Sequence, residues 1–456
     1  MVSAAEQLAS NLNLKAFTKA EDLKKRLWFT LGALVIFRLG TFIPLPGINP
    51  AAFAASFKSQ AGGILGMFNM FSGGALERLA IFALNIMPYI SASIIIQIMT
   101  SVSPKLEALK KEGESGRKQI NQYTRYLTVL LATLQAYGIA IGLEGSSSGV
   151  AGAIVHDPGW FFRFSTVITL VGGTMFLMWL GEQITQRGVG NGISLIIFAG
   201  IVAGLPSALA GLFELARAGS ISTPLLFSLI FLMLSVVAAV VFIERAQRRL
   251  LIQYPKRQVG TRMTQGESSH LPLKLNSAGV IPPIFASSLL LLPITAAQFM
   301  GSGGGPGSEW LNWIVASLGM GQPLHMLLTA ALIIFFAFFY TALVFNPKET
   351  ADNLRKYGGF LPGIRPGEKT AEYIDYVLTR ITLVGALYLA AVCVLPEFLV
   401  SYAALPFYFG GTSLLIAVSV TMDTVAQIQS HLLAHQYEGL IKKAKLRGAT
   451  NNRGRR

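Results

Sequence analysis

The chain has 456 residues, of which 52% are hydrophobic and only 13% are charged, and its formal net charge is +15. Soluble globular proteins carry about 25% charged residues, so this composition excludes an ordinary soluble protein. The apolar residues are gathered into long runs. This pattern excludes a transmembrane β-barrel, because barrel strands are short and alternate in polarity.

Ten apolar runs have the length, roughly 20 residues, that crosses a bilayer as a helix. They lie at about 27–46, 76–100, 126–143, 160–181, 192–212, 222–243, 277–298, 323–345, 377–396 and 406–428. We therefore predict a polytopic membrane protein with ten transmembrane helices.

The basic residues are strongly asymmetric across this arrangement. When the connections alternate between two sides, 31 of the 37 Lys and Arg residues fall on one side and four on the other, while Arg38 and Arg380 lie within runs. Loops rich in Lys and Arg stay in the cytoplasm, so we expect both termini to be cytoplasmic. The same basic loops could also dock an anionic partner, such as lipid headgroups, RNA or an acidic protein surface.

The ten runs divide into two sets of five near residues 219–222. Two halves with the same odd number of spans insert with opposite orientations, as in inverted repeats. We therefore expect a cytoplasmic segment at 1–26, one half at 27–221, a second half at 222–428 and a basic cytoplasmic tail at 429–456.

Three loops stand out between the runs. The loop 47–75 contains the apolar, glycine-rich segment 62–74. This segment is too short to span a membrane and too apolar for solvent, which is typical of a buried or re-entrant piece. The loops 244–276 and 346–376 mix basic residues with Pro and Gly, and we predict that both form folded cytoplasmic projections.

Two features inside the runs are unusual. Residues Asn85, Tyr89, Ser93 and Gln97 recur every four positions in the second run, and would form a polar stripe on one helical face. Such a stripe faces either neighbouring helices or a passage or movable seam. Arg38 lies midway along the first run, where it either has a function or extends to a membrane edge.

The sequence gives little sign of ion-coupled transport or of catalysis. Acidic side chains are almost absent from the middle of the runs, which disfavours ion-coupled transport. The chain contains no Gly-Lys-Ser/Thr phosphate-binding motif, and no Ser/His/Asp set is recognisable. His431 and His435 have helical spacing for a metal, but a solvent-facing pair at a helix end is the better interpretation. We expect neither a cofactor nor enzymatic activity.

Several segments are typical of one family. They are 69–74, 85–97, 111–117, the Gly-Val-Gly-Asn-Gly-Ile-Ser segment at 188–194, 270–274, 363–368 and 407–412. Through these motifs the chain resembles the SecY/Sec61-alpha family of channel subunits over essentially all ten runs. The resemblance implies an all-α polytopic membrane protein, in which two inverted five-helix halves form a clamshell around a central pore.

The resemblance also implies roles for individual residues. A ring of aliphatic side chains would narrow the pore at Ile86, Ile90, Ile193, Ile197, Ile284 and Ile416. A plug would close it with Gly66, Met67, Phe68, Asn69, Met70 and Phe71. A lateral gate between spans 2–3 and spans 7–8 would include Ser91, Gln97, Thr128 and Leu292. The motor or ribosome would dock on Arg257, Arg262 and Arg365.

The function implied is translocation of unfolded polypeptides across the bacterial inner membrane, with lateral release of membrane segments. The implied partners are SecE-like and SecG-like membrane subunits, the SecA motor ATPase, the ribosome, signal sequences and anionic lipids, but no DNA. One departure is Thr261-Arg262, where family members often carry adjacent basic residues. The alternative is a secondary transporter of a small solute, which the scarcity of carboxylates and the plug-like segment disfavour. A scaffold or insertase without a pore would need neither ring nor plug.

Overall fold

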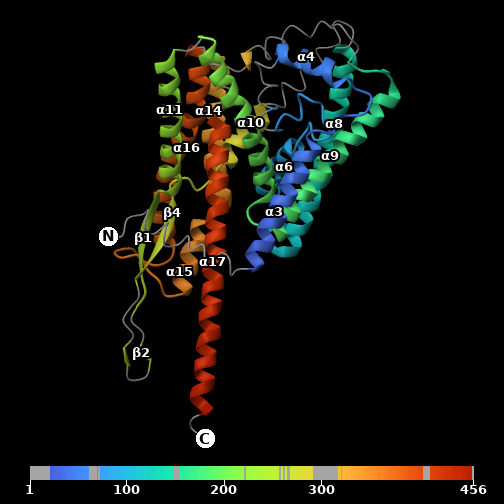
Figure 1. Ribbon diagram of the computed structural model, residues 1–456. Coiled ribbons are helices and arrows are strands. Elements are labelled where there is room, and N and C mark those ends of the chain that lie inside the picture. The colour runs from blue at the N-terminus through green and yellow to red at the C-terminus, as the bar shows by residue number, and fades with distance from the viewer. Residues whose placement is uncertain are drawn as a thin grey trace.

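The computed structural model describes residues 21–60, 69, 72–146, 154–219, 222–255, 258–259, 262–263, 268–290, 317–319, 321–403 and 411–453. These residues form mainly long helices (Figure 1). The helices that precede residue 220 are α3 (Glu21–Gly40), α4 (Pro50–Gln60), α6 (Met87–Val102), α7 (Pro104–Lys111), α8 (Glu114–Ser146), α9 (Trp160–Arg187) and α10 (Gly192–Arg217). The later ones are α11 (Thr223–Arg245), Ile281–Leu290, α14 (Pro323–Val344), α15 (Pro347–Lys356), α16 (Glu368–Ala403) and α17 (Gly411–Arg453).

The helices agree with a polytopic membrane protein. Among the described residues, seven helices are long and apolar enough to cross a membrane, namely α8, α9, α10, α11, α14, α16 and α17. Two shorter apolar helices, α6 and Ile281–Leu290, lie in the second and seventh predicted runs. Helix α3 overlaps the first run. Each of the ten predicted runs therefore contains a helix.

The helices pack in two groups (Figure 1). In one group α8 packs against α6 and α9, while α3 and α10 pack against α9 and each other. In the other group α16 packs between α14 and α17, and α11 packs against α17. Helices α10 and α3 also contact α17, so the two groups meet along this line.

The helix in the first run, α3, begins and ends about six residues earlier than the predicted run 27–46. Helix α3 ends at Gly40, so Arg38 lies in its last turn and not midway along it. The guanidinium donates to the carbonyl oxygen of Gly73 at 2.6 Å and lies over the ring of Phe42, 4.8 Å from its centroid. Arg38 is therefore bonded to the end of the predicted plug segment 62–74, and it does not lie midway along its helix.

The second run is only partly helical. Helix α6 begins at Met87, with Pro88 in its first turn, where a missing N–H costs nothing. Leu79 and Asn85 have positive φ angles of 44° and 50°, which interrupt a right-handed helix. Partners outside the run satisfy part of this backbone, because Leu45 N–H donates to Leu79 at 2.9 Å. Asn85 consequently lies outside the helix, and the predicted polar stripe begins only at Tyr89.

Both long basic loops are folded. Strands β1 (Gln247–Gln253) and β4 (Ser268–Lys274) form an antiparallel ladder, with β2 (Gln258–Val259) and β3 (Arg262–Met263) nearer its tip. The second loop begins with α15, whose first turn is capped by the side chain of Asn346. The two loops are joined where Gln253 and Phe360 exchange backbone hydrogen bonds of 2.9 Å.

A small separate core holds the two loops on the bundle. Its buried side chains come from both loops and from the first turns of α16: Leu250, Leu273, Leu361, Ile374, Val377 and Ile381. Burying an aliphatic side chain contributes roughly 1.5–3 kcal/mol. The loops therefore form one projection with a fixed position relative to α16.

Candidate pore and gate

A small cavity lies where the two helix groups meet. It is lined by Asn85, Ile86, Met87, Ile90, Ile197, Ile284 and Ser287. These residues come from three segments that are far apart in the sequence: the start of α6 with the two residues before it, the second turn of α10 and the helix Ile281–Leu290. Four of the six predicted ring residues are among them.

The remaining two ring residues belong to the same apolar cluster. Ile416 of α17 is fully buried, and Ile193 is partly buried in the first turn of α10. Ile86 is only 1% exposed, so little solvent reaches the ring at this point. A narrow aliphatic constriction offers water no hydrogen-bonding groups, and such constrictions gate by dewetting. All six isoleucines are thus placed together, but their role as a pore ring stays a prediction.

Close backbone packing positions the start of α10. A Cβ at Gly192 would clash with the carbonyl oxygen of Gly181 on α9, so only glycine fits here. The hydroxyl of Thr185 accepts a hydrogen bond of 2.9 Å from Gly192 N–H. The side chain of Asn191 caps the helix by accepting from Ile193 N–H at 3.2 Å. These contacts fix Ile193 and, one turn later, Ile197.

Three of the four predicted gate residues lie on α6 and α8. Ser91 is buried, and Gln97 donates to the Ser93 hydroxyl on its own helix at 3.1 Å. Thr128 is fully buried on α8, which packs against α6. The fourth residue, Leu292, lies outside the described residues. The structure therefore brings Ser91, Gln97 and Thr128 to one pair of helices.

The contacts between α6 and the helix Ile281–Leu290, across the predicted gate, are weak. Ser288 of the helix Ile281–Leu290 reaches the sulfur of Met87 on α6 at 4.0 Å. Beyond it, Phe285 meets Phe336 of α14 edge to face, with 5.7 Å between ring centroids. Thioether sulfur is a weak acceptor, so the seam between α6 and this helix rests mainly on apolar packing. Such a seam can separate without leaving charged groups unpaired.

Of the predicted plug, only Asn69 is described; Gly66, Met67, Phe68, Met70 and Phe71 lie outside the described residues. The Asn69 side chain accepts from Glu77 N–H at 2.9 Å and donates to the Glu77 carboxylate at 3.2 Å. Its carbonyl oxygen accepts from Gly74 N–H at 2.9 Å. Together with the bond from Arg38 to Gly73, these contacts anchor the chain where the predicted plug ends.

The structure describes two of the three predicted docking residues, Arg262 and Arg365. Arg257 lies outside the described residues, and Arg262 lies on strand β3, where its backbone pairs with Val259. Arg365 is exposed on the turn that precedes α16, and its carbonyl oxygen accepts from the Thr370 hydroxyl at 2.9 Å. The Arg365 backbone is therefore held by this bond, while the residue is exposed.

Sequence reasoning missed two residues that line the cavity, Met87 and Ser287, whereas it had named Asn85 in a polar stripe that could face a passage. Ser287 lies three positions after Ile284 on one helical face, a spacing that could have indicated it. Asn85 lies in a non-helical turn, so the helical spacing that singled it out does not describe its actual backbone.

Comparison with known proteins identifies the family. The SecY family model matches residues 80–425. The protein translocase subunit SecY of Escherichia coli K12 is 58% identical over 427 residues, which cover 94% of this chain and 96% of that protein. A SecY structure that concerns the plug domain superposes with a TM-score of 0.65 at 18% identity, covering 90% of this chain and 92% of that one. Sec61 in a canine ribosome–channel complex superposes with a TM-score of 0.59 at 16% identity, and it covers the same shares of the two chains. The chain belongs to the SecY family.

Proposed function

We propose that this chain is the pore-forming subunit of a protein-conducting channel in a bacterial inner membrane. It passes unfolded polypeptides across the membrane and releases membrane segments sideways into the lipid. The observation that supports this proposal is a small cavity lined by Ile86, Ile90, Ile197 and Ile284, with Ile193 and Ile416 in the same apolar cluster. Its E. coli relative is named a protein translocase subunit, which supports the same function.

A secondary transporter of a small solute is the alternative, and the cavity lining disfavours it. Among the described residues that line it, only Asn85 and Ser287 have polar side chains, and neither ionises. A solute transporter recognises its ligand with fixed polar groups at midplane, often at broken helices. An aliphatic ring instead suits a passage for chains of every composition, because it forms no specific bond with any side chain.

We assign the parts as follows. The ring closes the pore, the segment 62–74 acts as a plug, and α6 with α8 forms one wall of a lateral gate that faces the helix Ile281–Leu290 and α14. In the related SecY structure the plug domain is described as stabilising the closed state and maintaining a membrane seal. The halves 27–221 and 222–428 would be inverted repeats, with both termini in the cytoplasm.

The partners follow from the same proposal. The β1–β4 hairpin and the turn that carries Arg365 would receive the ribosome or the SecA motor, and SecE-like and SecG-like subunits would flank the bundle. A related Sec61 channel was solved in a ribosome complex. Because the motor or ribosome supplies the energy, the chain itself needs no catalytic step. Anionic lipids would bind its basic face.

Reconstitution tests the function. The full chain is purified with its co-purifying small subunits, placed in liposomes of E. coli polar lipid, and given SecA, ATP and an unfolded secretory precursor. We expect the precursor to become protected from added protease only when ATP is present. The same precursor without its signal sequence is the control. Equal protection without ATP, or none with it, would contradict the proposal.

The plug assignment gives a separate prediction. Deleting residues 62–74 is expected to raise the resting ion leak and to relax the requirement for a signal sequence. A few buried side chains contribute roughly 1.5–3 kcal/mol each, so the plug stabilises the closed state only modestly. Deleting these few residues removes that whole contribution, and the closed state is then less favoured. Planar-bilayer conductance and export of a precursor with a defective signal measure the two effects. A deletion variant as ion-tight as the parent would refute the assignment.

A further inference from the structure

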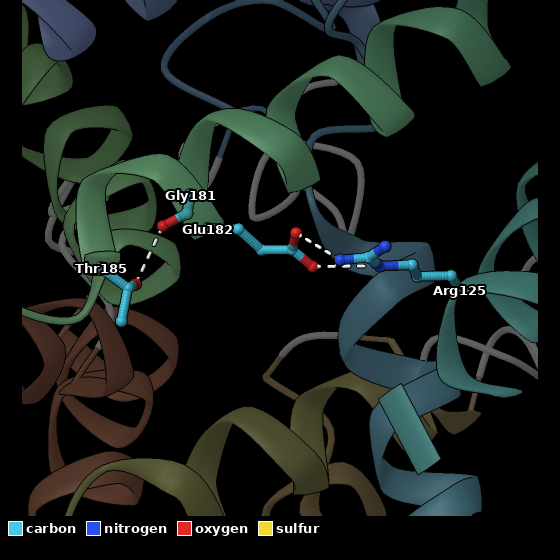
Figure 2. A network of polar contacts seen from close by, with 4 residues as sticks. All are labelled: Arg125, Gly181, Glu182 and Thr185. Atoms are coloured by element: carbon cyan, nitrogen blue, oxygen red, sulfur yellow. Dashed lines mark hydrogen bonds and ion pairs between the residues drawn. The ribbon is translucent and has the colours of Figure 1, made fainter. Parts of the chain in front are cut away.

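An ion pair joins α8 and α9 close to the predicted ring. Arg125 of α8 binds Glu182 of α9 through two bonds, Nη2 to Oε2 at 2.6 Å and Nε to Oε1 at 3.2 Å (Figure 2). The Arg125 side chain is 45% exposed and that of Glu182 is 25% exposed. A forked arrangement of this kind fixes the relative orientation of the two groups as well as their distance.

The pair lies beside α6, which carries Ile86 and Ile90 at and near its start. Tyr89 of α6 is within electrostatic reach of both Glu182 and Arg125. Helix α6 contacts both α8 and α9, so the three helices meet at this point. The helix that bears Ile90 is therefore in contact with both helices that carry this ion pair, α8 and α9.

The pair also lies beside the start of α10, which carries Ile193 and Ile197. Glu182 follows Gly181, the residue whose backbone touches Gly192 and whose missing Cβ leaves room for the Ile193 side chain. Thr185, one turn later, donates to the Gly181 carbonyl oxygen at 2.9 Å (Figure 2). The same hydroxyl accepts from Gly192 N–H at 2.9 Å. The turn of α9 that holds Glu182 is thus the support on which α10 begins.

We propose that Arg125 and Glu182 are positioning residues that keep α6 and α10 at the separation where the ring is closed, an inference that rests on the proposed channel function. Removing one partner leaves a partly buried charge without its counter-charge, which favours rearrangements that expose it to water. The easiest rearrangement here is a shift of α8 against α9, and this shift moves two pairs of ring residues apart.

A second ion pair provides a matched control. Arg163 of α9 binds Glu144 of α8 at 2.6 Å, and their side chains are 31% and 12% exposed. It joins the same two helices at the opposite end of the hairpin, where Glu144 also accepts from Gly159 N–H at 3.1 Å. The two pairs share their chemistry and their helices. They differ in position, because the Arg125–Glu182 pair lies beside α6 and the start of α10, whereas the Arg163–Glu144 pair lies at the opposite end of the hairpin.

The test compares single-channel recordings of the resting channel, without motor or substrate, for four variants of equal abundance. We expect Arg125→Gln and Glu182→Gln each to raise the resting leak about fivefold or more, the lower end of typical coupling between sites. Arg163→Gln should leave the leak at the parent level. The double exchange Arg125→Glu with Glu182→Arg should return the leak toward the parent, because the pair is re-formed with reversed polarity.

Two results would overturn the inference. One is an equal leak in the Arg125→Gln and Arg163→Gln channels, since the Arg125–Glu182 pair would then only hold α8 against α9, as the control pair does. The other is an unchanged leak in both the Arg125→Gln and Glu182→Gln channels. A channel with glycine in its ring separates this failure from failure of the channel function itself. If that channel leaks while both glutamine variants remain tight, only the positioning role is lost.

Discussion

A channel with glycine at four ring positions is expected to conduct chloride and water in its resting state. The four positions are Ile86, Ile90, Ile284 and Ile416. Three of them line the central cavity, and the fourth is fully buried in the same cluster. Replacing them by glycine removes the branched side chains that now exclude water, so the small cavity becomes a continuous wet passage.

Leucine at the same four positions is the matched control. Leucine keeps the aliphatic character and the volume, and such exchanges usually cost less than about 1.5 kcal/mol each. Glycine removes the whole side chain and weakens the helix by roughly 1 kcal/mol per position, so equal abundance of the two proteins must be checked first. Single-channel recordings then compare them. Equal conductance of the glycine and leucine channels would mean that these residues are ordinary packing and that the pore lies elsewhere.

The fold was largely predictable because the bilayer restricts what each run can do. A run of about 20 apolar residues has few alternatives to a spanning helix, and a helix lies in or overlaps each of the ten runs, although only seven helices of the described residues are long and apolar enough to cross a membrane. The start of α6 was not predictable. Residues before Met87 are as apolar as those after it, but their backbone bonds to another segment, as Ile81 N–H does to Ile43 at 3.0 Å. Such long-range partners leave no periodic signal in the sequence.

The site was predictable only in part, and for a similar reason. Helical spacing groups Ile86 with Ile90 and Ile193 with Ile197, but it does not distinguish them from neighbours such as Ile94. The family resemblance was needed to distinguish them. The Arg125–Glu182 pair joins residues 57 positions apart, and each residue alone is typical of the end of a spanning helix. Their pairing depends on how α8 packs on α9.

Reversing the charge of Arg365 is expected to block motor-driven translocation while leaving the abundance of the protein unchanged. Arg365 is exposed, and its neighbours hold the turn in place: Ile364 packs on the core of the projection, and Pro366 restricts the backbone before it. The guanidinium therefore reaches solvent from a stiff support. A forked guanidinium binds carboxylate or phosphate in a geometry that lysine does not reproduce.

The measurement is SecA-driven protection of a precursor in proteoliposomes that contain Arg365→Glu. We expect a loss of about tenfold or more, because a charged partner at a binding surface would then meet a like charge. Arg365→Lys keeps the charge without the fork and should recover only part of the activity. Lys348→Glu is the matched control: Lys348 is exposed in the first turn of α15, where a carboxylate suits the helix dipole, on the same projection. If Arg365→Glu supports parental export, or if Lys348→Glu fails equally, then Arg365 marks the topology of its loop and does not dock the motor.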